Sequence, residues 1–412
     1  MPGGDCFLAP ARGAVDMIPA LRARFNREWT PRRHETLLAE LEARAGVPLG
    51  FPVSETPCFF PAALLDEMAT TGASLVTSLL ANSEAQASAE ALVPARYLGP
   101  GQETTPTCVQ VDFGLVRELD GRLTPRLVEL QAFPSLYAFQ HTLAVLHREL
   151  YELPETCAAH AAGLDDLGYR QLVGDVLAGR HDPTEVALLE IAPEQQKTRP
   201  DFALTERLWG ITTVDPRDVI VRGRTLWRRH DGRETPIRRI YNRVIPDELE
   251  RTGHQMAFDY RDDLDVEWVG HPAWYFRLSK SAIPWLVHPS VPRTWRLDAV
   301  EALPEDRNAL VLKPLFSFAG GGIVFAPSDQ DLAAIPASQR HLFLLQERVK
   351  FEPVIDTPHG MTQAEVRIMY VWTDRLRAVL PLIRMGRGQM MGVAHNRGLA
   401  WVGASAGFAV TA

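Results

Sequence analysis

Apolar residues recur at helical spacing along the first part of the chain. Across residues 14–47 they predict a helical stretch, which Pro31 divides in two because proline interrupts the hydrogen bonding of a helix interior. Residues 61–81 and 136–152 show the same spacing and are also predicted to be helical. The apolar positions of the first stretch include Ile18, Leu21, Phe25, Leu37, Leu38 and Leu41.

Short apolar runs typical of strands dominate the remainder. Residues 186–191, 211–214 and 219–229 alternate with a predicted helix near 201–208, which indicates a small α/β unit. The last third adds strand-like runs at 309–313, 322–325, 341–349, 365–372 and 376–384. Helices and strands are therefore expected throughout, and no internal repeat is visible.

The most informative pattern is a β-hairpin. Asp120-Gly121 separates two alternating runs, 109–119 and 122–132, and this dipeptide favours a two-residue turn. With that turn, the polar positions of both runs share one face and the apolar positions share the other. Pro125 could introduce a bulge and shift this register.

Two carboxylates meet on the polar face of this hairpin. Asp112 is predicted to lie opposite Glu129, and Gln110 opposite Gln131. Like charges that face each other on a sheet repel unless a cation neutralises them, and carboxylate and amide oxygens are ligands that Mg²⁺ prefers. The hairpin pattern fits a magnesium site and a solvated polar face about equally well.

Residues 310–325 contain a glycine-rich segment, which is by itself a weak indication of a phosphate-binding loop. Gly320, Gly321 and Gly322 would let backbone N–H groups approach an anion. Lys313 ends the preceding apolar run, where its charge could reach phosphate oxygens. The segment matches neither a P-loop nor a Rossmann glycine pattern, and a plain turn beside a surface lysine is the alternative.

Other candidate residues for nucleotide binding flank this loop. Lys280 precedes a short predicted helix, and the end of the 341–349 run could present its backbone to an adenine edge. The residues concerned at that end are Gln346, Glu347 and Val349.

Several arginines are candidates for neutralising phosphate charge, although the sequence alone favours a surface or structural role for each of them. They are Arg367, Arg384 and Arg387. His395-Asn396 follows a loop, and we interpret it as a turn in preference to a ligand pair.

Composition narrows the classes of function. The chain has 412 residues, of which 46% are hydrophobic and 23% charged, and its net charge of -8 argues against non-specific nucleic-acid binding. No run approaches the roughly 18 apolar residues of a membrane span, and the N-terminus lacks a signal-peptide core, so a cytoplasmic protein is expected.

The cysteines are scattered without a CxxC pair, so they predict neither a zinc site nor a redox dithiol; they are Cys6, Cys58, Cys108 and Cys157.

Taken in order, these segments resemble the circularly permuted ATP-grasp proteins, which include the glutathionylspermidine synthetase family. The hairpin is similar to the family segment in which Asp, and then Glu-x-Asn, bind two magnesium ions. This similarity implies metal-binding roles for Asp112, Glu129 and Gln131, the last replacing the usual asparagine. Gln110 stands where the family often has an arginine that contacts the transferred phosphate.

The resemblance implies an α+β ATP-grasp fold in permuted order, because the metal-binding hairpin precedes the lysines instead of closing the chain. The expected divisions are a helical N-terminal region at 1–104, a permuted ATP-grasp segment with the hairpin at 105–183, a small Rossmann-like pre-ATP-grasp domain at 184–275 and the nucleotide-binding region at 276–412.

The same resemblance implies an ATP-dependent carboxylate-amine ligase. Lys280, Lys313 and the glycine loop would hold the phosphates of ATP, and Mg²⁺ would bridge them to the hairpin. A substrate carboxylate would attack the γ-phosphorus, and an amine would then displace phosphate from the acyl phosphate. Arg243, in a segment similar to an arginine-bearing segment of the family, and Arg367 are the catalytic candidates.

Two other functions share the same ATP site. One is a catalytically degenerate nucleotide-binding protein that acts through a partner, and the other is a phosphotransferase with a stable phosphorylated product. For the ligase, the expected partners are a small-molecule acid and a small-molecule amine, with no nucleic acid and no membrane.

Overall fold

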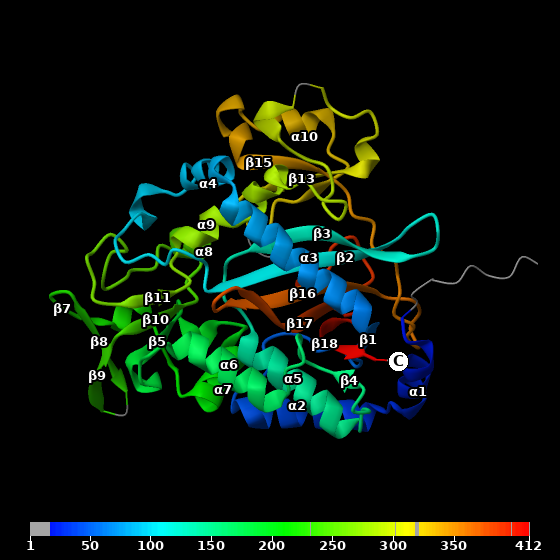
Figure 1. Ribbon diagram of the computed structural model, residues 1–412, viewed down its shortest axis with the longest axis horizontal. Helices are drawn as coiled ribbons and strands as arrows, with labels where there is room; N and C mark the ends of the chain where they lie inside the picture. Colours follow the sequence, from blue (N-terminus) through cyan, green and yellow to red (C-terminus); the bar gives the residue numbers. More distant parts are fainter. Residues whose placement is uncertain (1–16, 231, 301, 318–320, 397, 412) are drawn as a thin grey trace, which may run out of the picture.

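The structure is a computed structural model that describes residues 17–230, 232–300, 302–317, 321–396 and 398–411. Its largest element is a seven-stranded sheet in the order β1-β18-β17-β16-β2-β3, with β4 paired to β18 (Figure 1). All neighbours are antiparallel except β1 and β18. Its strands are β1 (Cys58–Pro61), β2 (Cys108–Arg117), β3 (Leu123–Gln131), β4 (Cys157–Ala158), β16 (Gln363–Trp372), β17 (Leu376–Gly386) and β18 (Gly403–Val410). This central sheet joins segments from both ends of the chain.

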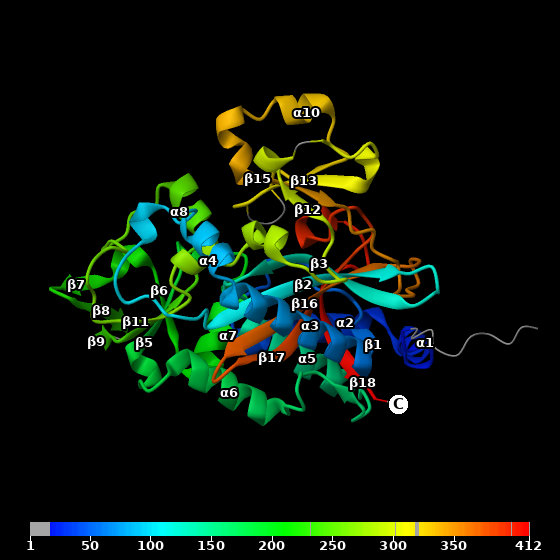
Figure 2. The same cartoon turned by 45° about the horizontal axis from the view of Figure 1, so that its top comes forward.

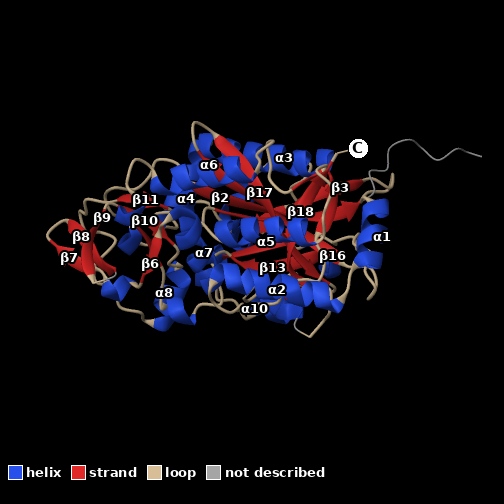
Figure 3. Cartoon of the chain, turned by 90° about the horizontal axis from the view of Figure 1, so that it is seen from below, coloured by secondary structure: helices blue, strands red, loops and turns tan. Residues whose placement is uncertain are grey.

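Helices cover both faces of the central sheet. On one face, α3 (Ala62–Ala81) buries Met68 and Leu75 in a cluster with Val111 and Ile368. On the other face, apolar side chains of α5 (Tyr137–Leu150) pack against β18, and α2 (Pro31–Ala45) lies beside α5 in the view from below (Figure 3). Helix α1 (Pro19–Glu28) precedes α2, and Pro31 begins α2, so the predicted division at that proline is confirmed.

A four-stranded parallel sheet in the order β11-β10-β5-β6 lies beside the central sheet. Its strands are β5 (Val186–Leu189), β6 (Thr212–Val214), β10 (Arg239–Asn242) and β11 (Glu267–Val269). Helix α7 (Arg199–Trp209) connects β5 to β6, and an antiparallel sheet follows, formed by β7 (Ile220–Arg222), β8 (Thr225–His230) and β9 (Arg233–Ile237). The remaining helices of this part are α6 (Asp166–Ala178), α8 (Pro246–Thr252) and α9 (Ala273–Arg277).

The third of the three larger sheets, hereafter the third sheet, stands beyond the β3 edge of the central sheet, in the order β12-β15-β13-β14 (Figure 2). Its strands are β12 (Thr294–Arg296), β13 (Leu310–Pro314), β14 (Val324–Phe325) and β15 (Phe343–Glu347), with α10 (Asp329–Ala333) packed beside them. The short 3-10 helix η5 (Lys280–Trp285) contacts β3 and β12, and α4 (Ser83–Glu90) contacts η5. The mixed α+β character expected from the sequence is therefore confirmed.

The hairpin turn differs from the expected one. The N–H of Glu118 donates to the carbonyl of Arg122, so the loop holds three residues, 119–121, and not two. Gly121 ends the loop with φ 84°, a left-handed conformation that favours glycine. The predicted two-residue turn is therefore wrong.

A second irregularity restores the register of the hairpin. The pairing shifts between Asp112 and Phe113, which leaves Val128 as the extra residue on β3. Beyond this bulge, Asp112 faces Glu129 as predicted. The bulge lies three residues from Pro125, the position from which the sequence suggested one.

No helix among the described residues is long and apolar enough to cross a membrane.

Helix α5 depends on a residue that is distant in the sequence. It starts without a side-chain cap of its own, and the buried carboxylate of Asp201 on α7 accepts the N–H groups of Leu136 and Phe139 at 3.1 and 2.9 Å. This contact ties the start of α5 to α7.

We predict that Asp201→Ala lowers the free energy of unfolding by about 1–3 kcal/mol, because buried backbone donors lose their acceptor. Urea denaturation followed by circular dichroism measures the change. Asp201→Asn keeps one acceptor oxygen and should cost less, and equal stability of the Ala variant and the wild type would contradict this capping role.

Candidate functional site

A row of charged side chains crosses one face of the central sheet. Asp112 on β2 lies opposite both Glu129 on β3 and Arg367 on β16. Glu365 on β16 lies opposite Arg384 on β17. Since side chains alternate between the faces of a strand, all five project from the same face.

Asp112 is the centre of this row. Its Oδ1 accepts from Arg367 Nε, and its Oδ2 accepts from Arg367 Nη2 and Arg384 Nη2, all at 2.6 Å. The side chain is buried, and burial alone would raise its pKa, but the two guanidinium groups hold the pKa of Asp112 below its usual value. The carboxylate is therefore ionised and firmly held.

Glu365 is a member of this row that the sequence interpretation missed. It is buried, and Arg384 Nη1 lies 3.1 Å from its Oε1. Burial raises the pKa of Glu365, and Arg384 only partly opposes that rise. Glu365 precedes Arg367 by two positions, so the two charged side chains share one face of a largely apolar strand. This pattern is the one by which the sequence could have identified Glu365.

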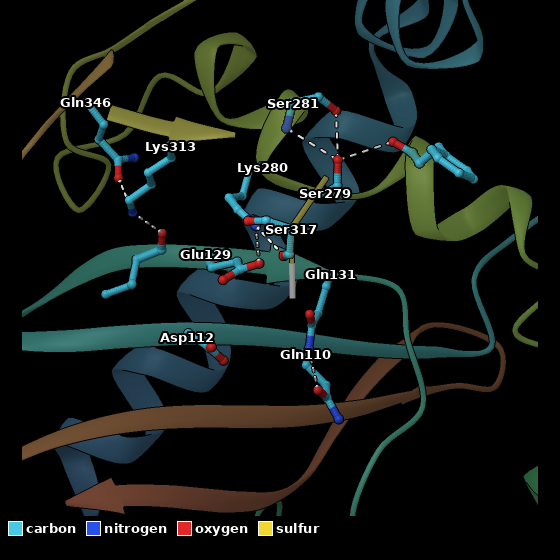
Figure 4. Close-up of polar contacts among 12 residues, drawn as sticks. Gln110, Asp112, Glu129, Gln131, Ser279, Lys280, Ser281, Lys313, Ser317 and Gln346 are labelled. Atoms are coloured by element: carbon cyan, nitrogen blue, oxygen red, sulfur yellow. Dashed lines mark hydrogen bonds and ion pairs between the residues drawn. The ribbon is translucent and has the colours of Figure 1, made fainter. Parts of the chain in front are cut away.

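Glu129 faces the third sheet across the edge of β3 (Figure 4). Lys280 Nζ lies 3.1 Å from Glu129 Oε1 and donates to the carbonyl of Ser317 at the same distance. The Glu129 side chain is 29% exposed, whereas that of Asp112 is 3% exposed. Of the two carboxylates, Glu129 is the one that an incoming ligand can reach.

Lys313 approaches the same edge from β13. Its Nζ donates to Gln346 Oε1 at 2.6 Å and to the carbonyl of Val128 at 3.3 Å. Burial lowers the pKa of Lys313 to about 8, although Glu129 acts in the opposite direction. Two lysines that are distant in the sequence therefore converge beside Glu129.

The amides of the hairpin lie next to this cluster. Gln131 Nε2 donates to Gln110 Oε1 at 2.8 Å, and Arg367 Nη1 donates to the same oxygen at 2.6 Å. The reversed amide of Gln131 would place its oxygen 2.9 Å from Arg367 Nη1, whereas the first orientation gives the oxygen of Gln110 two donors. In both cases the Arg367 guanidinium lies against Gln110 and Gln131.

Arg243 lies apart from the lysines. It is buried, donates to the carbonyl of Pro134, and its Nε is 3.9 Å from Glu190 Oε2. Burial raises the pKa of Glu190 to about 8. The described residues show no contact between Arg243 and either lysine, so its observed role is to hold the loop that follows β3.

The glycine loop is described in part. Gly320 lies outside the described residues, Gly321 is exposed, and Gly322 has φ 73°. A Cβ at Gly322 would come within 2.8 Å of the Pro314 ring. A larger residue is therefore disfavoured at this position both by the left-handed backbone conformation and by the contact with Pro314.

The predicted adenine-binding residues lie at the end of β15. Gln346 is buried and joins Lys313 to Thr294. Glu347 pairs with Leu310 on β13, and Val349 lies two residues beyond the end of the strand.

His395-Asn396 forms a turn, as interpreted from the sequence. The 3-10 helix η9 (Val393–Asn396) ends there, and the buried Asn396 side chain donates to the carbonyl of Met390 and accepts from the N–H of Arg387. Asn396 is therefore structural.

The oxygens of the hairpin suit a hard cation. A carboxylate offers about four lone-pair positions; the arginines use three on Asp112, and Lys280 uses one on Glu129. Glu129 thus keeps most of its lone-pair positions for a cation, and Asp112 keeps one such position, on Oδ1.

A cavity of about 960 Å³ lies elsewhere, among residues that follow β5 and β6. Its acidic and basic side chains pair with each other, as Arg217 does with Asp215 and Arg222 with Glu234. None of the residues of the charged row lines this cavity. We therefore place the candidate site at the charged row, where the chemically suited side chains meet.

Comparison with known proteins supports the fold. No family model and no curated protein sequence matches the chain. Among solved structures it is similar to the apo form of a glutathione synthetase-like effector (GSS30) from Globodera pallida, with 13% identity and a TM-score of 0.57, over 93% of this chain and 99% of that one. The chain therefore has a glutathione synthetase-like fold.

We predict that Asp112→Asn and Glu129→Gln differ sharply in stability. Loss of the Asp112 charge leaves two partly buried guanidinium groups poorly compensated and should cost about 3–5 kcal/mol, whereas Glu129 is itself partly exposed, so loss of its charge should cost less. Guanidinium chloride unfolding at pH 7 measures both, and equal stabilities would contradict this account of Asp112.

Acid should weaken the contribution of Asp112. A carboxyl whose pKa is lowered in the folded chain stabilises it above the unfolded pKa, and that stability is lost as the pH falls through the folded pKa. The stability difference between the wild type and Asp112→Asn should therefore shrink below about pH 4.

Proposed function

We propose that this protein is an ATP-dependent carboxylate-amine ligase on a circularly permuted ATP-grasp fold, similar to the glutathionylspermidine synthetase family. The observation that carries the proposal is the convergence of Lys280 and Lys313 beside Glu129, next to the buried carboxylate of Asp112. Two cations and two carboxylates at one sheet edge suit a magnesium-bound triphosphate. The glutathione synthetase-like fold supports the same class of reaction.

In this proposal, ATP lies between the third sheet and the β3 edge of the central sheet. Lys280 and Lys313 bind its phosphates, the glycine loop 320–322 covers them, and the strand end at 346–349 contacts adenine. Glu129, Asp112 and Gln131 would hold magnesium, which would supply neutralisation of the negative charge on the transferred phosphoryl group. For the phosphates to bind, Lys280 must exchange its present contact with Glu129 for a phosphate oxygen.

The chemistry then requires positioning and positive charge and needs no protein nucleophile. A substrate carboxylate attacks the γ-phosphorus, ADP leaves, and an amine displaces phosphate from the acyl phosphate. Arg367 is the catalytic candidate that best replaces the family arginine absent at Gln110, because its Nη1 already lies 2.6 Å from Gln110 Oε1. Arg243 acts in the proposal by holding the loop after β3.

A nucleotide-binding protein without ligase activity is the second candidate. The observation that favours it is the tight pairing of Asp112 with Arg367 and Arg384, which neutralises this carboxylate without a metal ion. Such a protein would bind MgATP but would form no acyl phosphate.

We predict that the wild type binds MgATP and releases ADP with at least one acid from a panel of amino acids, dicarboxylic acids and short peptides. Hydroxylamine traps an acyl phosphate as a hydroxamate, so hydroxamate formation separates a ligase from a nucleotide-binding protein and from a phosphotransferase with a stable product. Binding without ADP release or hydroxamate would favour the second candidate, and no binding would remove both.

Glu129→Gln should reduce ADP release by at least about 100-fold while the fold is kept, because the most accessible metal oxygen is neutralised. Glu118→Gln is the matched control, since Glu118 lies on the same hairpin but pairs with Arg126. Wild-type turnover in Glu129→Gln would remove the metal site from the proposal.

Lys313 provides a test that depends on pH. Its pKa of about 8 in the free chain should rise towards the usual value when a polyanion binds, so MgATP binding at about pH 8.5 should take up a proton. Calorimetry in buffers of different ionisation enthalpy measures this uptake. Lys313→Arg should bind without it, because arginine stays protonated, and Lys313→Ala should bind more weakly; unchanged affinity in Lys313→Ala would count against this residue.

A further inference from the structure

The charged row and the two lysines beside it carry more positive than negative charge. Among the described residues of this cluster, four cationic side chains meet three carboxylates. The carboxylates are Asp112, Glu129 and Glu365, and the cations are Arg367, Arg384, Lys280 and Lys313. A free dication gains little from a cluster without net negative charge, whereas the complex of magnesium with ATP is itself an anion. The charge of the site therefore favours the complex over the metal ion alone.

Lys280 is the cation that is paired with Glu129 (Figure 4). Its Nζ lies 3.1 Å from Glu129 Oε1, and its side chain is only 6% exposed, so water screens this pair weakly. A magnesium ion bound to the same oxygen at about 2.1 Å would lie within about 5 Å of this Nζ, close enough for strong repulsion between the two cations. Glu129 therefore has room for a metal ion, but the charge of Lys280 opposes it.

A capped turn holds the backbone of Lys280 beside β3. Lys280 begins η5, and the preceding Ser279 accepts the N–H of Ser281 through its Oγ and donates to the carbonyl of Phe276. Helix η5 contacts β3, the strand that carries Glu129. With the backbone fixed in this way, the ammonium group can change its partner by rotation of the side chain alone.

Asp112 and Glu129 differ in how firmly their present partners hold them. Asp112 accepts three hydrogen bonds of 2.6 Å from Arg367 and Arg384, which lie on strands of the same sheet. Glu129 has a single, longer ion pair, and the other acceptor of Lys280 is the neutral carbonyl of Ser317. Of the two carboxylates, Glu129 is therefore the one whose availability a ligand can change.

We propose that Lys280 is an internal counterion that opposes metal binding at Glu129 until a triphosphate draws the ammonium group away, so that metal and nucleotide bind together. This inference rests on the proposed ATP site and concerns its regulation. Phosphate oxygens give Lys280 a new anionic partner and release Glu129 for the metal ion. By linkage, nucleotide and metal each raise the affinity of the chain for the other.

The test measures metal binding by the full chain without nucleotide. Mn²⁺ accepts the same oxygen ligands as Mg²⁺, and electron paramagnetic resonance reports its free concentration. We expect weak binding by the wild type and binding at least about tenfold tighter in Lys280→Met, which removes the charge and keeps the length of the side chain. Lys280→Arg keeps the charge and should remain weak. The double variant Lys280→Met/Glu129→Gln should lose the gain, because the gain depends on the released carboxylate.

Lys313 provides an internal comparison. Its Nζ donates to the neutral oxygens of Gln346 and Val128. Since both lysines bind phosphate in the proposed function, Lys280→Met and Lys313→Met should both weaken MgATP binding. The large gain in Mn²⁺ affinity should appear in Lys280→Met alone, and an equal gain in Lys313→Met would overturn the specific role of Lys280.

Lys197→Met is the matched control for the loss of one positive charge. Lys197 is an exposed lysine beside Gly50, outside the charged row, and its loss should leave Mn²⁺ affinity within about twofold. Melting temperatures establish that each variant is folded. Tight Mn²⁺ binding by the wild type, unchanged affinity in folded Lys280→Met, or a gain that survives Glu129→Gln would overturn the proposal. The proposed function fails separately, if the wild type binds no MgATP, because the metal titration contains no nucleotide.

Discussion

The pairing of Asp112 with Arg367 and Arg384 is the interaction on which the rest of the site depends. Three charge-assisted hydrogen bonds of 2.6 Å hold one buried carboxylate between β16, β17 and β2. Buried charges are costly unless they are paired with good geometry, so this contact specifies how the three strands must align. Glu129 is positioned in turn because it faces Asp112 across the hairpin.

The edge position of β3 explains how two sheets can share one site. An edge strand has backbone groups that no neighbouring strand uses, and here the carbonyl of Val128 accepts from Lys313, while the N–H of Leu127 donates to the carbonyl of Ser290. The bulge at this point sets Val128 outside the regular pairing. The same irregularity that corrects the register therefore also provides a contact for the third sheet.

Local patterns in the sequence were sufficient to predict the two N-terminal helices, the hairpin and the pairing of Asp112 with Glu129. The three-residue loop was not predicted, because Asp-Gly also fits longer turns, and the bulge compensated for the error. Glu365 was missed because its importance comes from a neighbouring strand, and the burial of Arg243 comes from packing across elements. Contacts between distant segments leave no local pattern, so such features required the fold.

The central sheet also has a consequence for the order in which the chain is synthesised. Asp112 and Arg367 are separated by 255 positions, so a ribosome completes the β2–β3 hairpin long before either guanidinium partner exists. Until β16 and β17 emerge, the nascent hairpin exposes a polar face without its countercharges and an apolar face without its neighbouring strand. Contacts of such long range slow folding and prolong exposure of unpaired strand edges, so the growing chain is in greatest need of protection by chaperones during the interval between the hairpin and the last strands.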